Sequence, residues 1–223
     1  MATTADDYTV RLWALPSGRP VGPVLRYPTV GDVSLSPDGR TLAVTVPEGV
    51  VNPGVRIVDV ATRRQRASLF GDEAIWDVAR FTPDGRFLVG GSWKGWVRLW
   101  STDTWKPASR PLTGHAGAIL GQSMSPDGRT LATGSADGTI RLWDLRTEQP
   151  LGAALPGLPN RGVIPLFSPD GTHLFAVYDT GRAYRWDVRP SSWARQACAV
   201  AGRQLTRSEW EDALPDRAYD PAC

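Results

Sequence analysis

The segment "SADGTIRLWDL" (residues 135–145) places an Asp-Gly pair before an alternating run that ends in Trp143 and Asp144. Imperfect copies recur along the chain, and at the position of Trp143 they carry Trp13, Val58, Trp100 and Trp186, in steps of 45, 42, 43 and 43 residues. A second marker, "SPDG" or "TPDG", recurs in phase with the first, at 36–39, 82–85, 125–128 and 168–171. Two markers that share one period near 43 residues predict a repeat architecture.

One period contains four short segments with the length and punctuation of β-strands. In the best-preserved copy they cover 118–124, 130–135, 139–145 and 150–155, and Gly, Pro or Asp stands at every join. "SPDG" suits a tight turn because Pro fixes φ, Asp bonds nearby amides and Gly tolerates positive φ. Both faces of the third segment are apolar. We therefore expect a small antiparallel sheet that is buried between two neighbouring sheets.

The period, the Gly114-His115 pair, the "SPDG" turns and the "RLWD" strand together resemble WD40 repeats. The resemblance implies an all-β fold of about four to five propeller blades. It covers residues 1–188 and divides them into a partial blade at 1–28 and blades at 29–71, 72–115, 116–158 and 159–188. Because such rings usually have about seven blades, we expect an incomplete ring, a C-terminal fragment with an exposed apolar blade face at its N-terminal end. That face could support self-association.

Residues 189–223 differ from the repeats and predict a helical C-terminal cap. Ser192 is a possible N-cap for a helix that ends at Gly202, and Thr206 and Glu209 have capping-box spacing before a second helix that ends at Pro215. The stretch resembles tails that follow WD40 arrays in actinobacterial signalling proteins. We expect it to cover the last blade, because terminal repeats need a cap.

Composition narrows the possible function classes. The formal net charge is +2 and the charged residues are scattered, so neither a nucleic-acid nor a membrane partner is predicted. No signal peptide or spanning segment is evident, which makes the cytoplasm the expected location. Cys198 and Cys223 are the only cysteines. They could be bridged, although a reducing cytoplasm favours two thiols.

Four residues in the best-preserved repeat have the types found in catalytic sites, namely His115, Ser135, Asp137 and Trp143. Ser, His and Asp are the parts of a nucleophilic triad, but no G-x-S-x-G motif supports one. The WD40 resemblance implies instead a structural hydrogen-bond network between a loop, two strands and a turn. No metal-ligand spacing and no phosphate-binding loop is present, so no metal, cofactor or catalytic residue is expected.

One turn departs from the repeat pattern in a way that indicates binding. Trp93, Lys94 and Trp96 stand where the next repeat has Ala136, Asp137 and Thr139. Trp76 replaces the Ile119 of the next repeat. In WD40 propellers these loops share one rim that often binds partners, and Trp beside a cation is typical of binding hot spots. Trp76 could instead point inward and pack.

These observations favour a non-enzymatic WD40 scaffold or sensor domain that binds a protein or peptide through its loop rim. An alternative is a C-terminal regulatory fragment of a larger signalling NTPase or kinase. A hydrolase that uses His115 and Ser135 is the weakest of the three hypotheses.

Overall fold

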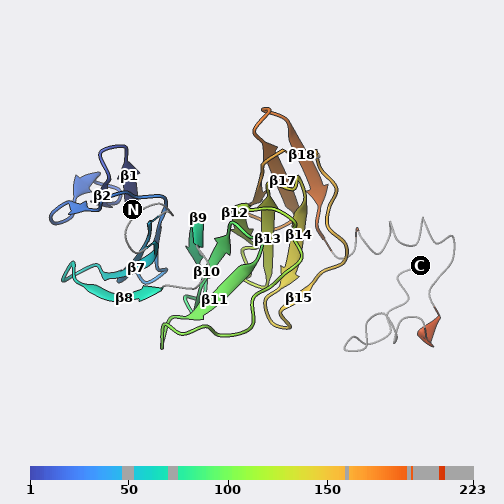
Figure 1. Cartoon of the computed structure of the whole chain (residues 1–223), viewed down its shortest axis with the longest axis horizontal. Coiled ribbons are helices and arrows are strands. Elements are labelled where there is room, and N and C mark those ends of the chain that lie inside the picture. The colour runs from blue at the N-terminus through green and yellow to red at the C-terminus, as the bar shows by residue number, and fades with distance from the viewer. Residues whose placement is uncertain (47–52, 70–74, 159–160, 190–191, 193–205, 209–223) are drawn as a thin grey trace.

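Eighteen short strands form five antiparallel sheets in the computed structural model, which describes residues 1–46, 53–69, 75–158, 161–189, 192 and 206–208 (Figure 1). For residues 75–77 it describes the backbone alone. Within this part of the chain no helix is long and apolar enough to cross a membrane. The all-β class predicted from the repeats is confirmed.

The sheets follow one another along the chain. The first two contain β1 (Ala2–Ala5), β2 (Thr9–Ala14), β3 (Arg19–Pro20) and β4 (Leu25–Arg26), then β5 (Val33–Leu35), β6 (Thr41–Val46), β7 (Gly54–Asp59) and β8 (Gln65–Leu69). The third contains β9 (Ile75–Phe81), β10 (Phe87–Ser92) and β11 (Val97–Ser101). The last two contain β12 (Ile119–Met124), β13 (Thr130–Ser135), β14 (Ile140–Asp144) and β15 (Gln149–Pro150), then β16 (Val163–Phe167), β17 (His173–Tyr178) and β18 (Ala183–Asp187).

The "SPDG" turns join the first two long strands of a sheet through one repeated arrangement. At residues 125–128, Ser125 Oγ donates a hydrogen bond to Asp127 Oδ1 at 2.5 Å. Gly128 has φ +70°, a conformation that costs glycine little. The same Ser or Thr to Asp bond recurs at Asp38, Asp84 and Asp170. The turn chemistry predicted from the sequence therefore closes four hairpins.

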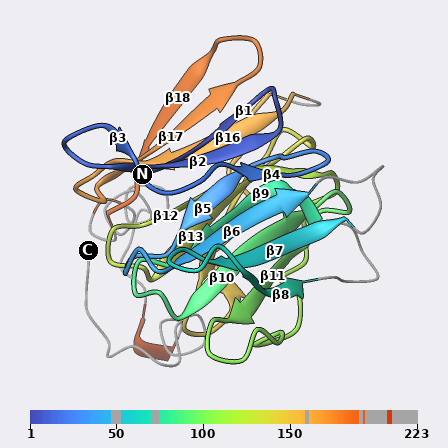
Figure 2. The same cartoon turned by 90° about the vertical axis from the view of Figure 1, so that its left-hand side faces the viewer.

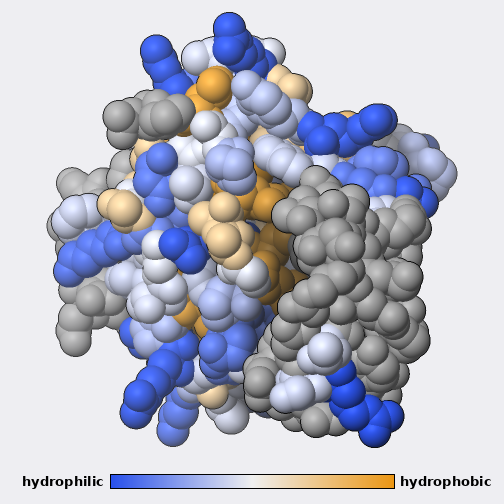
Figure 3. All heavy atoms as spheres, turned by 90° about the vertical axis from the view of Figure 1, so that its right-hand side faces the viewer, coloured by the Kyte–Doolittle hydropathy of each residue, from blue (hydrophilic) through white to orange (hydrophobic). Residues whose placement is uncertain are grey.

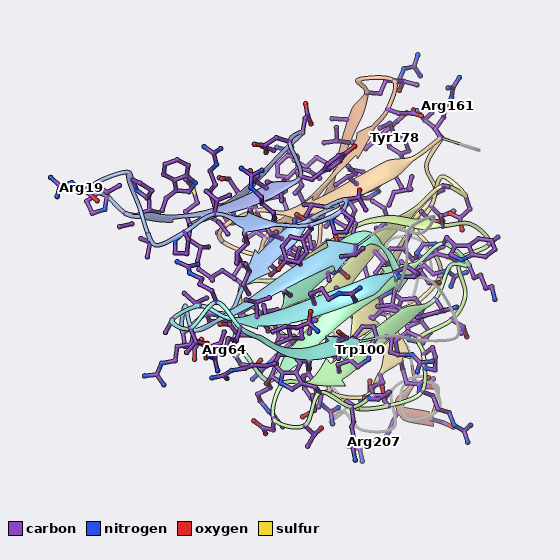
Figure 4. The ribbon with its side chains drawn as sticks, turned by 60° about the vertical axis from the view of Figure 1, so that its left-hand side comes forward. Arg19, Arg64, Trp100, Arg161, Tyr178 and Arg207 are labelled. Carbon is purple, nitrogen blue, oxygen red and sulfur yellow. The ribbon has the colours of Figure 1, made fainter. Side chains whose placement is uncertain are left out.

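The apolar cores lie between sheets. Each buried cluster draws its side chains from two neighbouring sheets, as where Trp143 of β14 packs with Val89 and Leu99 of the preceding sheet. Trp100 packs in the same way among residues of the second sheet, and Figure 4 shows it inside the stack. Each inner sheet therefore buries both faces on its neighbours, and each end sheet buries one, which explains why the sequence repeats.

The sheets form an open stack. The first sheet lies at one end in Figure 1, and β16–β18 lie far from it; the two overlap in Figure 2 only because that view looks along the stack. The outward face of the first sheet carries Arg11, which is exposed, beside Thr3 and Trp13. The exposed apolar sheet face that we expected at this end is found instead on β16 and β17.

Two further expectations need correction or remain open. The strand expected at 150–155 is only Gln149–Pro150, with an isolated bridge from Ile140 to Leu155, because the chain turns at Gly152 with φ +77°. The tail helices, Cys198 and Cys223 fall outside the described residues, apart from residues 192 and 206–208. The repeat boundaries and the helical cap therefore stay predictions.

Candidate functional site

The turns that close hairpins β10–β11, β13–β14 and β17–β18 lie at residues 93–95, 136–138 and 179–181. The loop that joins the third sheet to the fourth packs against the first of them. A Cβ on Gly95 would come within 2.6 Å of the carbonyl oxygen of His115 and 2.8 Å of that of Gly117. Only glycine fits there, at φ +84°. The turn and the loop therefore form one continuous surface.

A chain of buried hydrogen bonds ties this loop to the fourth sheet. Trp143 Nε1 donates to Thr133 Oγ1 at 2.8 Å, and Thr133 Oγ1 lies 2.9 Å from His115 Nε2. On the other side of the ring, His115 Nδ1 lies 3.2 Å from Asp137 Oδ2. Every group is satisfied if Thr133 donates to Nε2 and Nδ1–H donates to the carboxylate. The chain links strand β14, strand β13, the loop and the turn.

The charge states of His115 and Asp137 follow from burial and hydrogen bonding. Burial lowers the pKa of His115 below its usual range, although the nearby Asp137 carboxylate acts in the opposite direction. Burial by itself would raise the pKa of Asp137, but hydrogen bonds from Thr139 and from the Ala116 amide outweigh it, and the pKa is lowered. A neutral imidazole and a carboxylate are therefore the stable forms near neutral pH.

Ser135 ties the same loop to the same turn through hydrogen bonds of its own, as the network expected from the sequence implies, but it does not lie between Trp143 and His115. Its hydroxyl donates to the carbonyl oxygen of Gly117 at 2.9 Å and accepts from the Asp137 amide at 3.1 Å. Thr133, two residues earlier on the same face of β13, supplies the hydroxyl that bridges Trp143 and His115. Because both imidazole nitrogens of His115 have other partners and Ser135 is fully buried, the geometry does not form a Ser-His pair.

The two tryptophans of the unusual turn have different environments. The Trp93 side chain is 43% exposed, and Lys94 Nζ lies 5.6 Å from its ring centroid. Trp96 is only 7% exposed, and the Arg98 guanidinium carbon lies 5.3 Å from its ring centroid. The expectation of an exposed Trp96 is wrong, because its parity on the strand turns it with Arg98 toward the neighbouring sheet. Trp76 lies in β9, but its side chain is outside the described residues.

Two arginines at equivalent positions of β11 and β14 complete the surface. Arg98 stacks on Trp96, and the Arg141 guanidinium lies so close to Gly114 that a Cβ there would be 3.0 Å from it. Leu112 pairs with Val97 at the start of β11. The loop therefore passes this point with Gly114, and the Arg141 guanidinium that lies against Gly114 is brought near the start of β11. Neither arginine forms an ion pair within the described ranges, and a buried Nε of each has no hydrogen-bond partner there. We call Trp93, Lys94, Arg98 and Arg141 the rim patch.

The described residues contain no group of three or more His, Cys, Asp or Glu side chains that could hold a metal ion. Sequence reasoning had singled out Trp93 and Lys94 but missed Arg98 and Arg141. The signal that could have found the arginines is their place two residues before Trp100 and Trp143, on the same face of the strand.

Comparison with protein families identifies the repeats. The family model for the WD domain, G-beta repeat, matches residues 63–101 and 106–144. No curated protein matches the chain. Each matched segment starts at the outer edge of one sheet and ends with the third strand of the next, as from β8 to β11. The resemblance noted in the sequence is confirmed: these segments are WD40 repeats, and one repeat links two neighbouring blades.

Proposed function

We propose that this chain of WD40 repeats is a non-enzymatic scaffold or sensor domain that binds an acidic peptide segment of a partner protein on the rim patch. WD40 repeats in general mediate protein–protein interaction. The observation that carries the proposal is the exposed Trp93 with Lys94 beside its ring, on a turn that packs against the loop beside which Arg141 lies. We expect this interaction to take place in the cytoplasm.

The chemistry of the rim patch favours a partner that offers both an apolar side chain and carboxylates. Trp93 offers a large apolar surface that is only partly covered, and such anchors supply much of the affinity in protein interfaces. Arg98 and Arg141 have planar guanidinium groups that match carboxylates in a bidentate geometry. Because neither has an ion pair in the described part of the chain, a partner's carboxylate would supply the counter-charge.

The hydrogen-bond chain at His115 supports a structural role for the residues that resemble catalytic groups. It holds the loop next to Gly95 and so fixes the position of Gly114, over which Arg141 lies. A rigid loop lowers the entropy cost of presenting the rim patch to a partner. In this proposal, His115 and Asp137 position the binding surface without touching the partner.

Selection from a random peptide display library on the whole protein tests the proposal. We expect selected peptides to be rich in Asp and Glu around an apolar or aromatic residue, and their binding to weaken as the salt concentration rises. Peptides without acidic residues would contradict the proposal.

A pair of variants locates the binding site. Trp93→Ala combined with Arg141→Gln should weaken binding of a selected peptide at least about tenfold, as expected for loss of a hot spot. Leu15→Ala with Arg19→Gln removes an exposed apolar side chain and an exposed cation far from the rim patch, and it should leave binding unchanged. Equal effects of the two pairs would show that the peptide binds elsewhere.

A further inference from the structure

The last sheet exposes an apolar face that does not belong to the rim patch. Along β16 and β17 burial alternates, so that one face packs on the fourth sheet and the other is open. Ile164 pairs with Val177 and Leu166 pairs with Phe175 across the two strands, which places all four side chains on one face. They are 37–49% exposed. With Arg185 of β18, which pairs with Phe175, they form what we call the terminal face.

The equivalent positions in the preceding sheets are buried. Ala132 and Val89 match Phe175 in their repeats, both are 0% exposed, and each packs against the next sheet along the stack. Figure 3 looks at this end of the molecule and shows apolar side chains gathered beside hydrophilic ones. A contiguous apolar face of a β-sheet is usually a contact surface.

One substitution indicates what covers the terminal face. Arg185 stands where the two preceding repeats have Leu142 and Leu99, which are 4% and 1% exposed. Another blade of the same kind would place apolar side chains on this guanidinium and leave a buried charge without a partner. Arg185 is exposed and has no ion pair within the part of the chain that the structure describes. The occupant of the face should therefore carry both apolar side chains and carboxylates.

The chain itself contains one such segment outside the described residues. The sequence "EWEDALPD" (209–216) combines Trp210 and Leu214 with four carboxylates and has no basic residue. We propose that segment 209–216 covers the terminal face of its own chain, with Trp210 and Leu214 on the apolar side chains and a carboxylate beside Arg185. About twenty residues separate β18 from this segment, which can span several tens of ångströms at about 3.3 Å per residue.

Two further arguments favour the segment of the same chain over a second copy. A short tether gives a segment an effective local concentration in the millimolar range, which no second molecule reaches in dilute solution. The carboxylate nearest along the same face of β18, Asp187, is already paired with Arg189, so two copies joined through this face would leave both Arg185 side chains without a free counter-charge. The segment supplies the charge as well as the apolar contact.

Hydrogen–deuterium exchange of the full chain tests the proposal. In the variant Trp210→Ala, Leu214→Ala, amides of β16 and β17 should exchange about tenfold faster or more, because the sheet that they belong to loses its cover. Amides of β12–β14 serve as an internal standard for correct folding and should not change. A control variant, Trp93→Ala with Leu15→Ala, removes the same side-chain types from other exposed positions and should not affect β16 or β17. Unchanged exchange of β16 and β17 in the first variant would overturn the proposal.

A charge exchange tests the role of Arg185 separately. Arg185→Glu should accelerate exchange of β16 and β17, and combining it with Glu209→Arg, Glu211→Arg and Asp212→Arg should restore slow exchange. Failure of this rescue would remove the electrostatic part of the proposal. If the chain is instead a dimer that Leu166→Glu dissociates, while the variant at Trp210 and Leu214 has no effect, the face is an interface between copies and the proposal is wrong.

Discussion

The replacement Thr133→Val tests the hydrogen-bond chain with little change in side-chain volume. Thr133 is 0% exposed, and its hydroxyl serves both Trp143 Nε1 at 2.8 Å and His115 Nε2 at 2.9 Å. Valine leaves two buried polar groups without partners, and each costs about 1–3 kcal/mol. We expect the free energy of unfolding to fall by about 2–4 kcal/mol, less than the sum of the upper limits because the two groups can relax.

Urea denaturation followed by tryptophan fluorescence measures this loss, provided that the m-value is unchanged. Thr130→Val, in the same strand, is the matched control, because the Thr130 hydroxyl forms no hydrogen bond to any residue that the structure describes. Its effect should stay within about 0.5 kcal/mol. Combining Thr133→Val with Trp143→Phe should cost less than the sum of the two single changes, because both remove the same bond. If Thr133→Val were no more destabilising than the control, the hydrogen bonds of the Thr133 hydroxyl would not stabilise the fold, and the reasoning would be refuted.

Three further changes have outcomes that follow from the structure. Burial holds the folded-state pKa of His115 below its unfolded value of about 6.5, so the unfolded protein binds a proton first as the pH falls. The free energy of unfolding should therefore be lower near about pH 5.5 than near about pH 7.5. This difference between the two pH values should be smaller in His115→Asn. Gly134→Ala should destabilise by about 1–3 kcal/mol or more, because its Cβ would lie 2.2 Å from the Val163 carbonyl oxygen, and thermal unfolding would detect the change. Trp96→Ala should cost about 3–5 kcal/mol in chemical denaturation and Trp93→Ala less than about 1 kcal/mol, in line with exposures of 7% and 43%; equal costs would contradict the assignment of Trp93 to binding.

The repeat period and the turn residues were enough to predict the sheets. The residues of "SPDG" are themselves sufficient to predict a tight turn, and the Asp137-Gly138 pair predicts the hairpin of β13 and β14, because these signals are local. The strand at Gln149–Pro150 was predicted too long, since the bend at Gly152 depends on how the chain meets the next sheet.

The candidate site was less predictable because its contacts are not local. Thr133 and Ser135 are two residues apart on one face of β13, and both carry a hydroxyl, so spacing alone could not show which of them meets Trp143. The burial of Trp96 was predictable in principle because Trp96 has the same strand parity as the buried Trp100. The placement of Arg141 over Gly114 was not, because it depends on the path of the loop between two sheets.

The most direct test of the central claim, that the rim patch binds an acidic segment, is the exchange footprint of a selected acidic peptide on the intact protein. Backbone amides at 92–97 and 112–117 should be protected when the peptide is bound, and the protection should disappear in Trp93→Ala, Arg141→Gln. Protection confined to β16–β18, or protection that the double variant leaves unchanged, would contradict the claim.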